Sequence, residues 1–171
     1  MRAGPSIALA PSAAAILLSC SLLGCSKPAA PGDAGGSTTA AAAAPAPTDA
    51  QKKAILATLP AAYQSADLDN GQAKFATCKS CHTIAQGGDT MVGPNLWGVF
   101  GRKAGSLPGF AYSGGMKALG ITWDADRINT WITRPSAMVP GTKMTYVGME
   151  NPKDRVDVIA YLKTVTTTPT P

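Results

Sequence analysis

The sequence predicts an all-α domain with long irregular loops. No stretch of useful length alternates apolar and polar residues, as a half-buried strand would. Near the C-terminus, apolar residues recur every third position, as on one face of a helix: Val156, Ile159, Leu162 and Val165. Residues 83–121 are rich in Gly and Pro, and a loop of that length is unusual in a compact domain. We therefore expect three to five helices joined by Gly/Pro-rich loops.

Helix start and stop signals place these helices along the chain. Asp69 or Asn70 is expected to cap a helix that runs towards residue 78. Thr122 is expected to cap a second helix, which ends before Pro135. Asn151, followed by a proline suited to the first helical position, predicts the start of the last helix.

The clearest chemical motif is the run Cys78-Lys79-Ser80-Cys81-His82, which contains the only histidine of the chain. C-x-x-C-H is the attachment signature of c-type haem. Two thiols three positions apart lie on one helical turn, where each can form a thioether to a haem vinyl group. The next residue then presents an imidazole nitrogen to the iron. A zinc site would need two further Cys or His ligands, and a thioredoxin-like C-x-x-C would not need the histidine.

Composition agrees with a haem protein and argues against nucleic-acid binding. The 15 basic and 10 acidic residues give a net charge of +5, and no basic run is long enough to bind nucleic acid. Apart from the motif, the cysteines are Cys20 and Cys25 in the apolar N-terminus, so the body holds no pair for a structural disulfide. Aromatic residues make up only 6% of the chain, and a buried porphyrin would add apolar mass to the core.

Residues 1–25 predict an export signal. The segment ends Leu22-Leu23-Gly24-Cys25, which resembles the lipobox of bacterial lipoproteins, where a lipidated cysteine follows the cleavage point. Cys20 ends a second, weaker match. The expected location is the periplasmic side of a bacterial membrane, with a lipid anchor on Cys25. The alternatives are an uncleaved N-terminal transmembrane anchor and an ordinary cleaved signal.

Composition then divides the rest of the chain. Residues 26–58 are assigned to a flexible linker rich in Ala, Pro and Gly, and residues 59–171 to the haem domain. Residues 51–64 show some helical periodicity, broken at Pro60. They predict a weak helix or an arm packed on the domain.

A second protein ligand of haem c iron is usually Met or His. Because no second histidine exists, the field narrows to Met, Lys or an open site. The methionines of the body are Met91, Met116, Met138, Met144 and Met149. Met144 is favoured because it follows a rigid segment, Val139 to Lys143, that contains Pro and a Gly turn. Met91 and Met116 are interpreted as core fillers.

Several ordered stretches resemble class I cytochrome c, from about residue 69 to residue 165. They are the residues 93–105 (GPNLWGVFGRKAG), 109–113 (GFAYS), 120–123 (GITW), 139–144 and 157–163 (DVIAYLK). The resemblance implies the cytochrome c fold, wrapped around one covalently bound haem c. The tethered layout resembles the membrane-attached bacterial members of that family.

The resemblance also implies roles for the residues that match the family pattern. Cys78 and Cys81 hold the porphyrin, His82 is the proximal ligand and Met144 the distal one. The carbonyl of Pro94 is expected to accept a hydrogen bond from His82, which fixes the tautomer of the ring.

Other matching positions are implied to surround the haem or to join two helices. Arg102, Tyr112 and Trp123 correspond to residues that hydrogen-bond a haem propionate. Trp131 stands where mitochondrial relatives have Tyr near the ligating sulfur. The contact between the first and last helices corresponds to Gly71, Phe75 and Tyr161.

These expectations lead to an electron carrier rather than an enzyme, because an iron with both axial positions filled binds no substrate. By resemblance, the partners are a cytochrome bc1-like quinol–cytochrome c reductase and a terminal oxidase or reductase. The docking surface is thinly basic, with Lys79, Lys143 and Lys103 near the expected haem edge, and we expect a monomer. The alternative is a haem sensor or peroxidase-like domain whose Met144 is displaced by a gas or peroxide.

Overall fold

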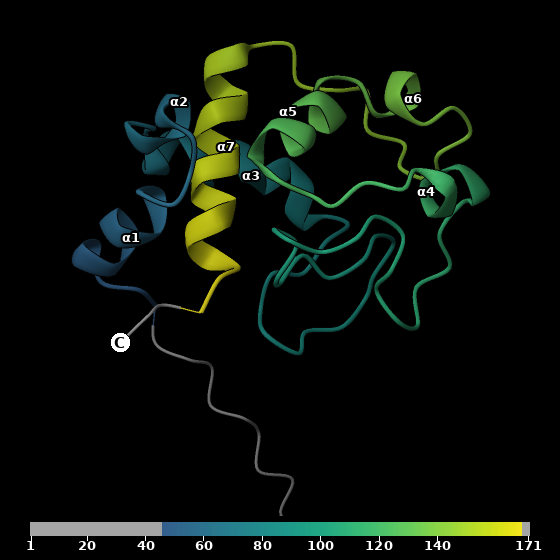
Figure 1. Cartoon of the computed structure of the whole chain (residues 1–171), viewed down its shortest axis with the longest axis horizontal. Helices are drawn as coiled ribbons and strands as arrows, with labels where there is room; N and C mark the ends of the chain where they lie inside the picture. Colours follow the sequence, from purple (N-terminus) through teal and green to yellow (C-terminus); the bar gives the residue numbers. More distant parts are fainter. Residues whose placement is uncertain (1–45, 169–171) are drawn as a thin grey trace, which may run out of the picture. The chain divides into compact units, whose positions relative to one another are not determined.

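Helices supply the regular structure of residues 46–168, the part of the chain that the computed structural model describes (Figure 1). The longer helices are α1 (Asp49–Leu56), α3 (Leu68–Lys79), α5 (Ala125–Thr133) and α7 (Pro152–Val165). Short helices of four or five residues are α2 (Ala61–Gln64), α4 (Gly114–Ala118) and α6 (Pro135–Met138). Within residues 46–168 the only extended pairing is an isolated bridge between Lys103 and Thr122. The predicted all-α class with irregular loops is confirmed.

Helices α3 and α7 pack directly against each other. Gly71 lies so close to α7 that a Cβ atom there would collide with the backbone of Asp157. One turn further along α3, the ring of Phe75 lies 5.7 Å from the ring of Tyr161, centroid to centroid. The predicted contact between the helices, with its glycine and its aromatic pair, is therefore present.

The start of α3 differs from the expectation. Asp67 is the N-cap, and its carboxylate accepts hydrogen bonds from the backbone N–H groups of Asp69 (3.1 Å) and Asn70 (2.9 Å). Asp69 lies in the first turn, where a negative charge also suits the helix dipole. Adjacent acidic and amide residues give the same capping signal, and the earliest of them took the role.

Of the other two predicted helix starts, one is confirmed and one is wrong. Asn151 caps α7 as expected. Thr122 does not cap α5, because it is drawn into the bridge with Lys103. Asp124 takes that place, and its carboxylate accepts from the backbone N–H of Arg127 at 2.8 Å. Helix α5 ends at Thr133, before the proline, as predicted.

Helix α1 falls inside the stretch assigned to the flexible linker, so the linker prediction is wrong for residues 49–58. Thr48 and Gln51 form a capping box at its start, and Ile55, Leu56 and Leu59 are buried. The linker was predicted because the preceding residues are rich in Ala and Pro, and the burial of these three apolar side chains was not foreseen. The interpretation of residues 51–64 as an arm packed on the domain is the correct one. The predicted export signal, Cys25 and the earlier part of the linker lie outside the described residues.

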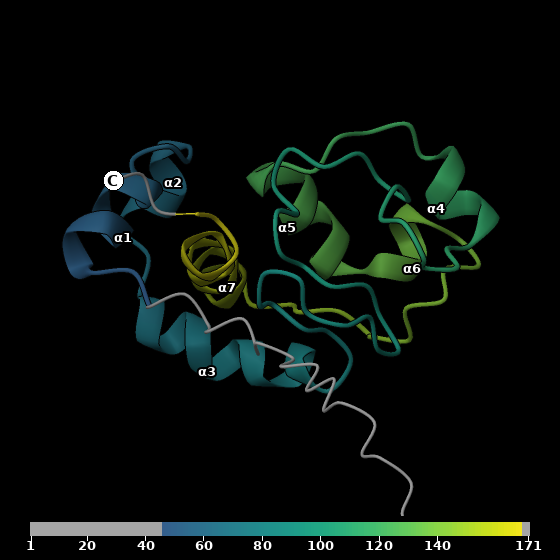
Figure 2. The same cartoon turned by 90° about the horizontal axis from the view of Figure 1, so that it is seen from below.

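Helix α7 separates two parts of the described structure. Helices α1 and α2 lie on one side of it, and helices α4, α5 and α6 with the long loop lie on the other (Figures 1 and 2). One apolar core joins these parts, with contributions from Leu59, Phe75, Ile128 and Ile159. No helix within residues 46–168 combines the length and hydropathy needed to cross a membrane.

Candidate haem-binding site

One cavity of about 310 Å³ collects every haem-contact residue that the sequence singled out. Its walls come from the end of α3, from α5 and α7, and from the loops between α3 and α4 and between α6 and α7. The predicted lining residues found there are Cys78, Cys81, His82, Pro94, Arg102, Tyr112, Trp123, Trp131 and Met144. The volume lies in the range of ligand sites, and the lining is mostly apolar.

The two thiols and the imidazole are brought together by the way α3 ends. Cys78 lies in the last turn of the helix, and its carbonyl accepts from the backbone N–H groups of Cys81 (3.1 Å) and His82 (3.0 Å). The chain therefore keeps turning beyond α3 and directs all three side chains to one wall. Burial, with a smaller effect of the neighbouring Cys81 thiol, raises the pKa of Cys78 to about 11.

His82 has its ring orientation set by the following loop. Its Nδ1 lies 2.7 Å from the carbonyl oxygen of Pro94. Since a carbonyl only accepts, Nδ1 carries the proton and Nε2 keeps its lone pair for a metal. Burial lowers the pKa of His82, although the bond to Pro94 opposes this effect. The ring is therefore neutral near pH 7, the form that binds iron.

Gly93 leaves room for this imidazole. A Cβ atom at Gly93 would overlap the ring of His82. The backbone N–H of Gly93 donates to the carbonyl of Cys81 at 2.9 Å, which holds the loop against the motif. Sequence analysis did not assign a role to Gly93 itself, because the closeness of its Cα to a ring eleven positions away is a tertiary feature.

Within the described residues, only two methionines line the cavity, Met116 and Met144. Met116 lies in α4, is 7% exposed and belongs to the buried core. Met144 lies in the extended segment after α6 and is half-buried. Met91, Met138 and Met149 do not line the cavity, which leaves Met116 as the competitor of Met144 for a role as ligand.

A turn and two hydrogen bonds fix the backbone of the segment that carries Met144. Gly141 has a φ of +72°, a conformation that favours glycine and turns the chain after Pro140. Lys143 donates from Nζ to the carbonyl of Ala111 at 2.6 Å, which ties this segment to the long loop. The backbone N–H of Met144 donates to Oγ1 of Thr142 at 3.2 Å.

Tyr146 is a lining residue that sequence analysis missed. Thr142, Met144 and Tyr146 are half-buried and alternate with exposed residues, as side chains of an extended segment do. The alternation of side chains every two residues, counted from Met144, would have predicted Tyr146 as a lining residue. Burial raises the pKa of Tyr146, and the nearby Cys78 thiol adds to the effect.

The polar end of the cavity is arranged around Arg102. Its guanidinium donates to the carbonyls of Asn95 (3.0 Å) and Trp97 (3.2 Å), which still leaves N–H donors for another acceptor. Burial raises the pKa of Tyr112, so its phenol stays a donor. Among the described residues, the lining includes no Asp or Glu that would repel an anionic group.

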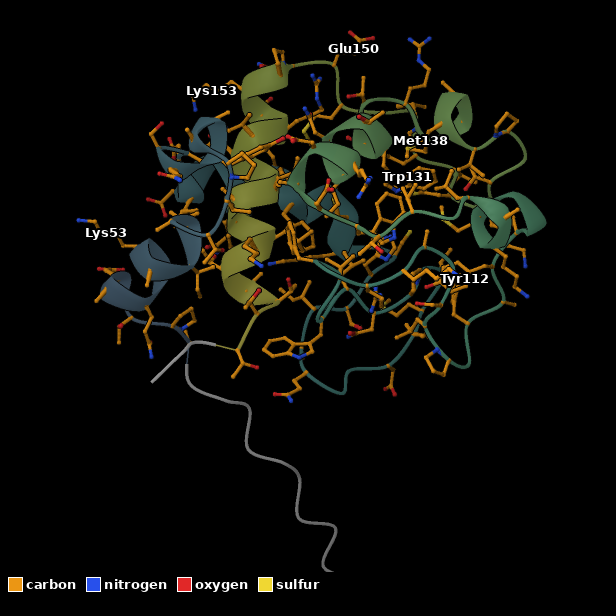
Figure 3. The ribbon with its side chains drawn as sticks, in the orientation of Figure 1. Lys53, Tyr112, Trp131, Met138, Glu150 and Lys153 are labelled. Atoms are coloured by element: carbon orange, nitrogen blue, oxygen red, sulfur yellow. The ribbon has the colours of Figure 1, made fainter. Side chains whose placement is uncertain are left out.

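Two tryptophans complete the wall on the α5 side. The rings of Trp123 and Trp131 lie 5.8 Å apart and are tilted by 53°. Figure 3 shows Trp131 and Tyr112 on the side of α7 away from Lys53, which lies on α1. The cavity is thus formed without residues of α1 or α2.

These features fit a haem and do not fit zinc. Two thiols, a neutral imidazole, a thioether and a group of cationic and phenolic donors surround an apolar space, which matches the vinyl groups, iron and propionates of haem c. No group of three or more His, Cys, Asp and Glu side chains in residues 46–168 is placed to hold a metal ion.

Comparisons with known proteins agree with this site. The cytochrome c family model matches residues 68–166, more than half of the chain. Cytochrome c2 of Rhodomicrobium vannielii is 48% identical over 103 residues, which cover 60% of this chain and 82% of that protein. Cytochrome c2 of Rhodoblastus acidophilus is 49% identical over 96 residues, which cover 56% of this chain and 90% of that protein.

Among solved structures, cytochrome cH from Methylobacterium extorquens aligns with a TM-score of 0.54 and 44% identity, over 57% of this chain and 98% of that one. The family model covers helices α3 to α7 and every predicted haem-contact residue. The chain therefore belongs to the cytochrome c family, as a class I, c2-like member that carries one covalently bound haem c and serves in electron transport rather than as an enzyme.

Proposed function

We propose that this protein is a membrane-tethered, periplasmic one-electron carrier whose haem iron is held by His82 and Met144. The observation that carries the proposal is the convergence of the imidazole, both thiols and one half-buried thioether on a single cavity. When bound, the haem supplies one-electron chemistry between ferric and ferrous iron.

The protein's residues hold the iron in one coordination state. His82, oriented by Pro94 at 2.7 Å, presents Nε2, and Met144 presents its sulfur. A thioether ligand favours the ferrous state and raises the reduction potential, as does an apolar pocket. With His82 and Met144 as ligands, the iron would have no open position for a substrate and would supply one-electron chemistry only.

Arg102, Tyr112 and Trp123 are proposed to donate hydrogen bonds to a haem propionate. An unpaired carboxylate in an apolar cavity is costly. Arg102 is itself held by the carbonyls of Asn95 and Trp97, so its remaining donors are already oriented. Trp131 is proposed to lie beside the sulfur of Met144, where an indole N–H donates but does not accept.

The proposed partners are a cytochrome bc1-like quinol–cytochrome c reductase and a terminal oxidase or reductase. They would dock at the cavity mouth, where the exposed lining residues carry only one charge: Thr77, Ser80, Val92, Lys143 and Thr145. Val92 lines the cavity and is 74% exposed, and the exposed Val147 follows the lining residue Tyr146. Lys143 lines the cavity as well, whereas Lys103 is exposed but does not line it.

The tether is proposed from the sequence alone. Lipidation of Cys25 would give a periplasmic lipoprotein, and an uncleaved N-terminal span is the alternative. In either arrangement the residues after 25 would act as a linker. A carrier held in this way meets its membrane partners at an effective concentration of order millimolar.

The ligand assignment is tested with two methionine variants of the haem-loaded protein. We expect Met144→Ala to abolish the charge-transfer band from methionine to ferric iron and to lower the reduction potential. Met116→Leu, a change of similar volume in the competing methionine, should keep both. Survival of the band in Met144→Ala would show that the assignment is wrong.

Carbon monoxide separates the carrier from the sensor or peroxidase-like alternative. The untreated ferrous protein at neutral pH is expected not to bind it, because Met144 occupies the position. Ready binding would favour the alternative, in which Met144 is displaced.

A further inference from the structure

The segment 48–66, here called the N-terminal extension, precedes the stretch that the family model matches. It contains α1 and α2, which both contact α7. Leu56, Leu59 and Tyr63 belong to the buried core that also includes residues of α7. None of its residues lines the haem cavity. The extension is therefore an addition to the family domain, and contact with the haem does not explain its presence.

One side chain of the extension reaches beyond α7. Tyr63 is 2% exposed, and its hydroxyl donates to Oδ1 of Asp126 at 2.9 Å. Asp126 lies in the first turn of α5. A hollow of about 480 Å³ lies between the extension and this turn, lined by Leu59 and Pro60 on one side and by Ala125 and Arg127 on the other. The hydrogen bond from Tyr63 to Asp126 links the extension to α5 beside this hollow.

Helix α5 in turn forms part of the haem cavity. Ile128, Trp131 and Ile132 line it. The end of α5 also holds the segment that follows Met144. The backbone N–H of Met149 donates to the carbonyl of Ile132 at 2.8 Å, and Gly148 lies so close to Thr133 that no Cβ atom would fit between them.

We propose that the N-terminal extension is a brace for the distal side of the haem, in which Tyr63 positions α5 and so keeps Met144 on the iron. Tyr63 is a positioning residue, because it acts through Asp126 and α5 and touches neither ligand. The proposal rests on the ligation of Met144 proposed above. Movement of α5 shifts both the wall at Trp131 and the anchor of the methionine segment at Ile132, so loss of the brace raises the fraction of molecules in which Met144 has left the iron.

Binding of added imidazole to the ferric, full-length protein measures that fraction. Imidazole must replace Met144, so its apparent affinity rises in proportion to the population with an open position. Tyr63→Phe removes one hydroxyl and leaves the ring in place. We expect it to tighten imidazole binding by roughly threefold to tenfold, the range that follows from loss of one hydrogen bond of ordinary net strength.

Thr164→Val is the matched control. Its hydroxyl is also buried and donates one hydrogen bond, to the carbonyl of Tyr161 at 2.7 Å, but it has no link to α5. Tyr63→Phe and Thr164→Val are both expected to unfold at a lower urea concentration than the unaltered protein, whereas Thr164→Val should leave the imidazole affinity unchanged.

Asp126→Ala should tighten imidazole binding as much as Tyr63→Phe does. Asp126→Asn should keep an affinity near that of the unaltered protein, because the amide oxygen still accepts. The double variant Tyr63→Phe/Asp126→Ala should bind imidazole no more tightly than either single variant.

An unchanged imidazole affinity in Tyr63→Phe, with stability lowered as in Thr164→Val, overturns the brace and leaves the ligand assignment intact. Absence of the methionine charge-transfer band from the unaltered protein overturns the ligand assignment, and the brace with it.

Discussion

His82 owes its chemical state to backbone groups rather than to another titratable side chain. The carbonyl of Pro94 accepts a hydrogen bond from Nδ1–H at 2.7 Å, and Gly93 fits against the ring because it has no Cβ. A backbone acceptor keeps the same charge at every pH, so the tautomer does not depend on solution conditions. Residues 93–94 of the loop thus set the orientation of the His82 ring.

Gly93→Ala tests this close fit. The added methyl group must push the imidazole or the loop aside, and overpacking of this kind costs about 1–3 kcal/mol. We expect a lower free energy of unfolding in guanidinium chloride and a weaker haem–histidine interaction, seen as a shifted visible spectrum of the ferric protein. Gly114→Ala is the control, because a Cβ there meets open space. Equal stability of the two variants would argue against the close fit.

Sequence analysis located the chemistry-bearing residues because motif and family spacing identify residue types. It did not find Gly93 against His82, or Tyr146 beside Met144 in the lining. Both depend on how the chain folds back on itself. Spacing along the chain carries that information only where the backbone conformation is already known.

The junction of α3 and α7 depends on one buried carboxylate. Asp157 of α7 is 1% exposed. It accepts from the backbone N–H of Asp67 (3.0 Å), from Nδ2 of Asn70 (2.7 Å) and from Nζ of Lys153 (2.5 Å). Burial alone would raise the pKa of Asp157, but these donors outweigh it and hold the pKa below its ordinary value of 3.8. The start of α3 is thereby tied to α7.

A depressed pKa makes this junction sensitive to acid. The carboxylate contributes stability above the ordinary pKa of 3.8, and the contribution is lost as the pH falls through the lower value of the folded state. Asp157→Asn should lower the free energy of unfolding at pH 7 by about 1–3 kcal/mol and should flatten its fall between neutral and acidic pH. Urea unfolding of both proteins across this range measures the effect.

Asp49→Asn serves as the reference, since Asp49 pairs with Lys52 on the surface and exposed pairs contribute little. A parallel acid dependence of Asp157→Asn and the unaltered protein would contradict the role of Asp157.

The sequence predicted the start of a helix correctly where only one residue could serve as the N-cap. Asn151 before its proline gave the start of α7 correctly. Asp67, Asp69 and Asn70 are all capping residues within four positions, and only the fold distinguishes them. Helix α1 was assigned to the linker because of the composition of residues 26–58, and a helix of eight residues is marginal alone. Burial of Leu56 against the rest of the core stabilises it, and that contact is not visible in the local sequence.

Helices α1 and α2 of the N-terminal extension lie on one side of α7, and helices α4, α5 and α6 lie on the other (Figures 1 and 2). No residue of the extension lines the haem cavity. The cavity side, with Val92 and Val147 exposed, stays available for a partner. Family membership was evident from the sequence, whereas this placement of the extension needed the structure.

A tethered carrier with a weakly charged docking surface should transfer electrons at a rate that depends weakly on salt. Long-range steering is screened by added salt, but a tether replaces steering by effective concentration. We expect roughly a twofold change or less in the rate of oxidation of the anchored protein between low and physiological ionic strength. Flash-induced or stopped-flow oxidation in membranes measures this rate.

The Cys25→Ser form is the comparison, since under the lipid-anchor proposal it is released. Its second-order rate should be slower at the same protein concentration and should fall more with salt. A steep fall for the anchored form would contradict docking through a weakly charged surface.

The most direct test of the account is the methionine methyl resonance in the proton NMR spectrum of the reduced protein. A methyl group on an iron-bound sulfur lies over the porphyrin ring and is shifted far upfield. We predict one such three-proton signal, present in Met116→Leu and absent from Met144→Ala. A spectrum without the signal, or one in which it disappears with Met116 instead, would contradict an iron held between His82 and Met144.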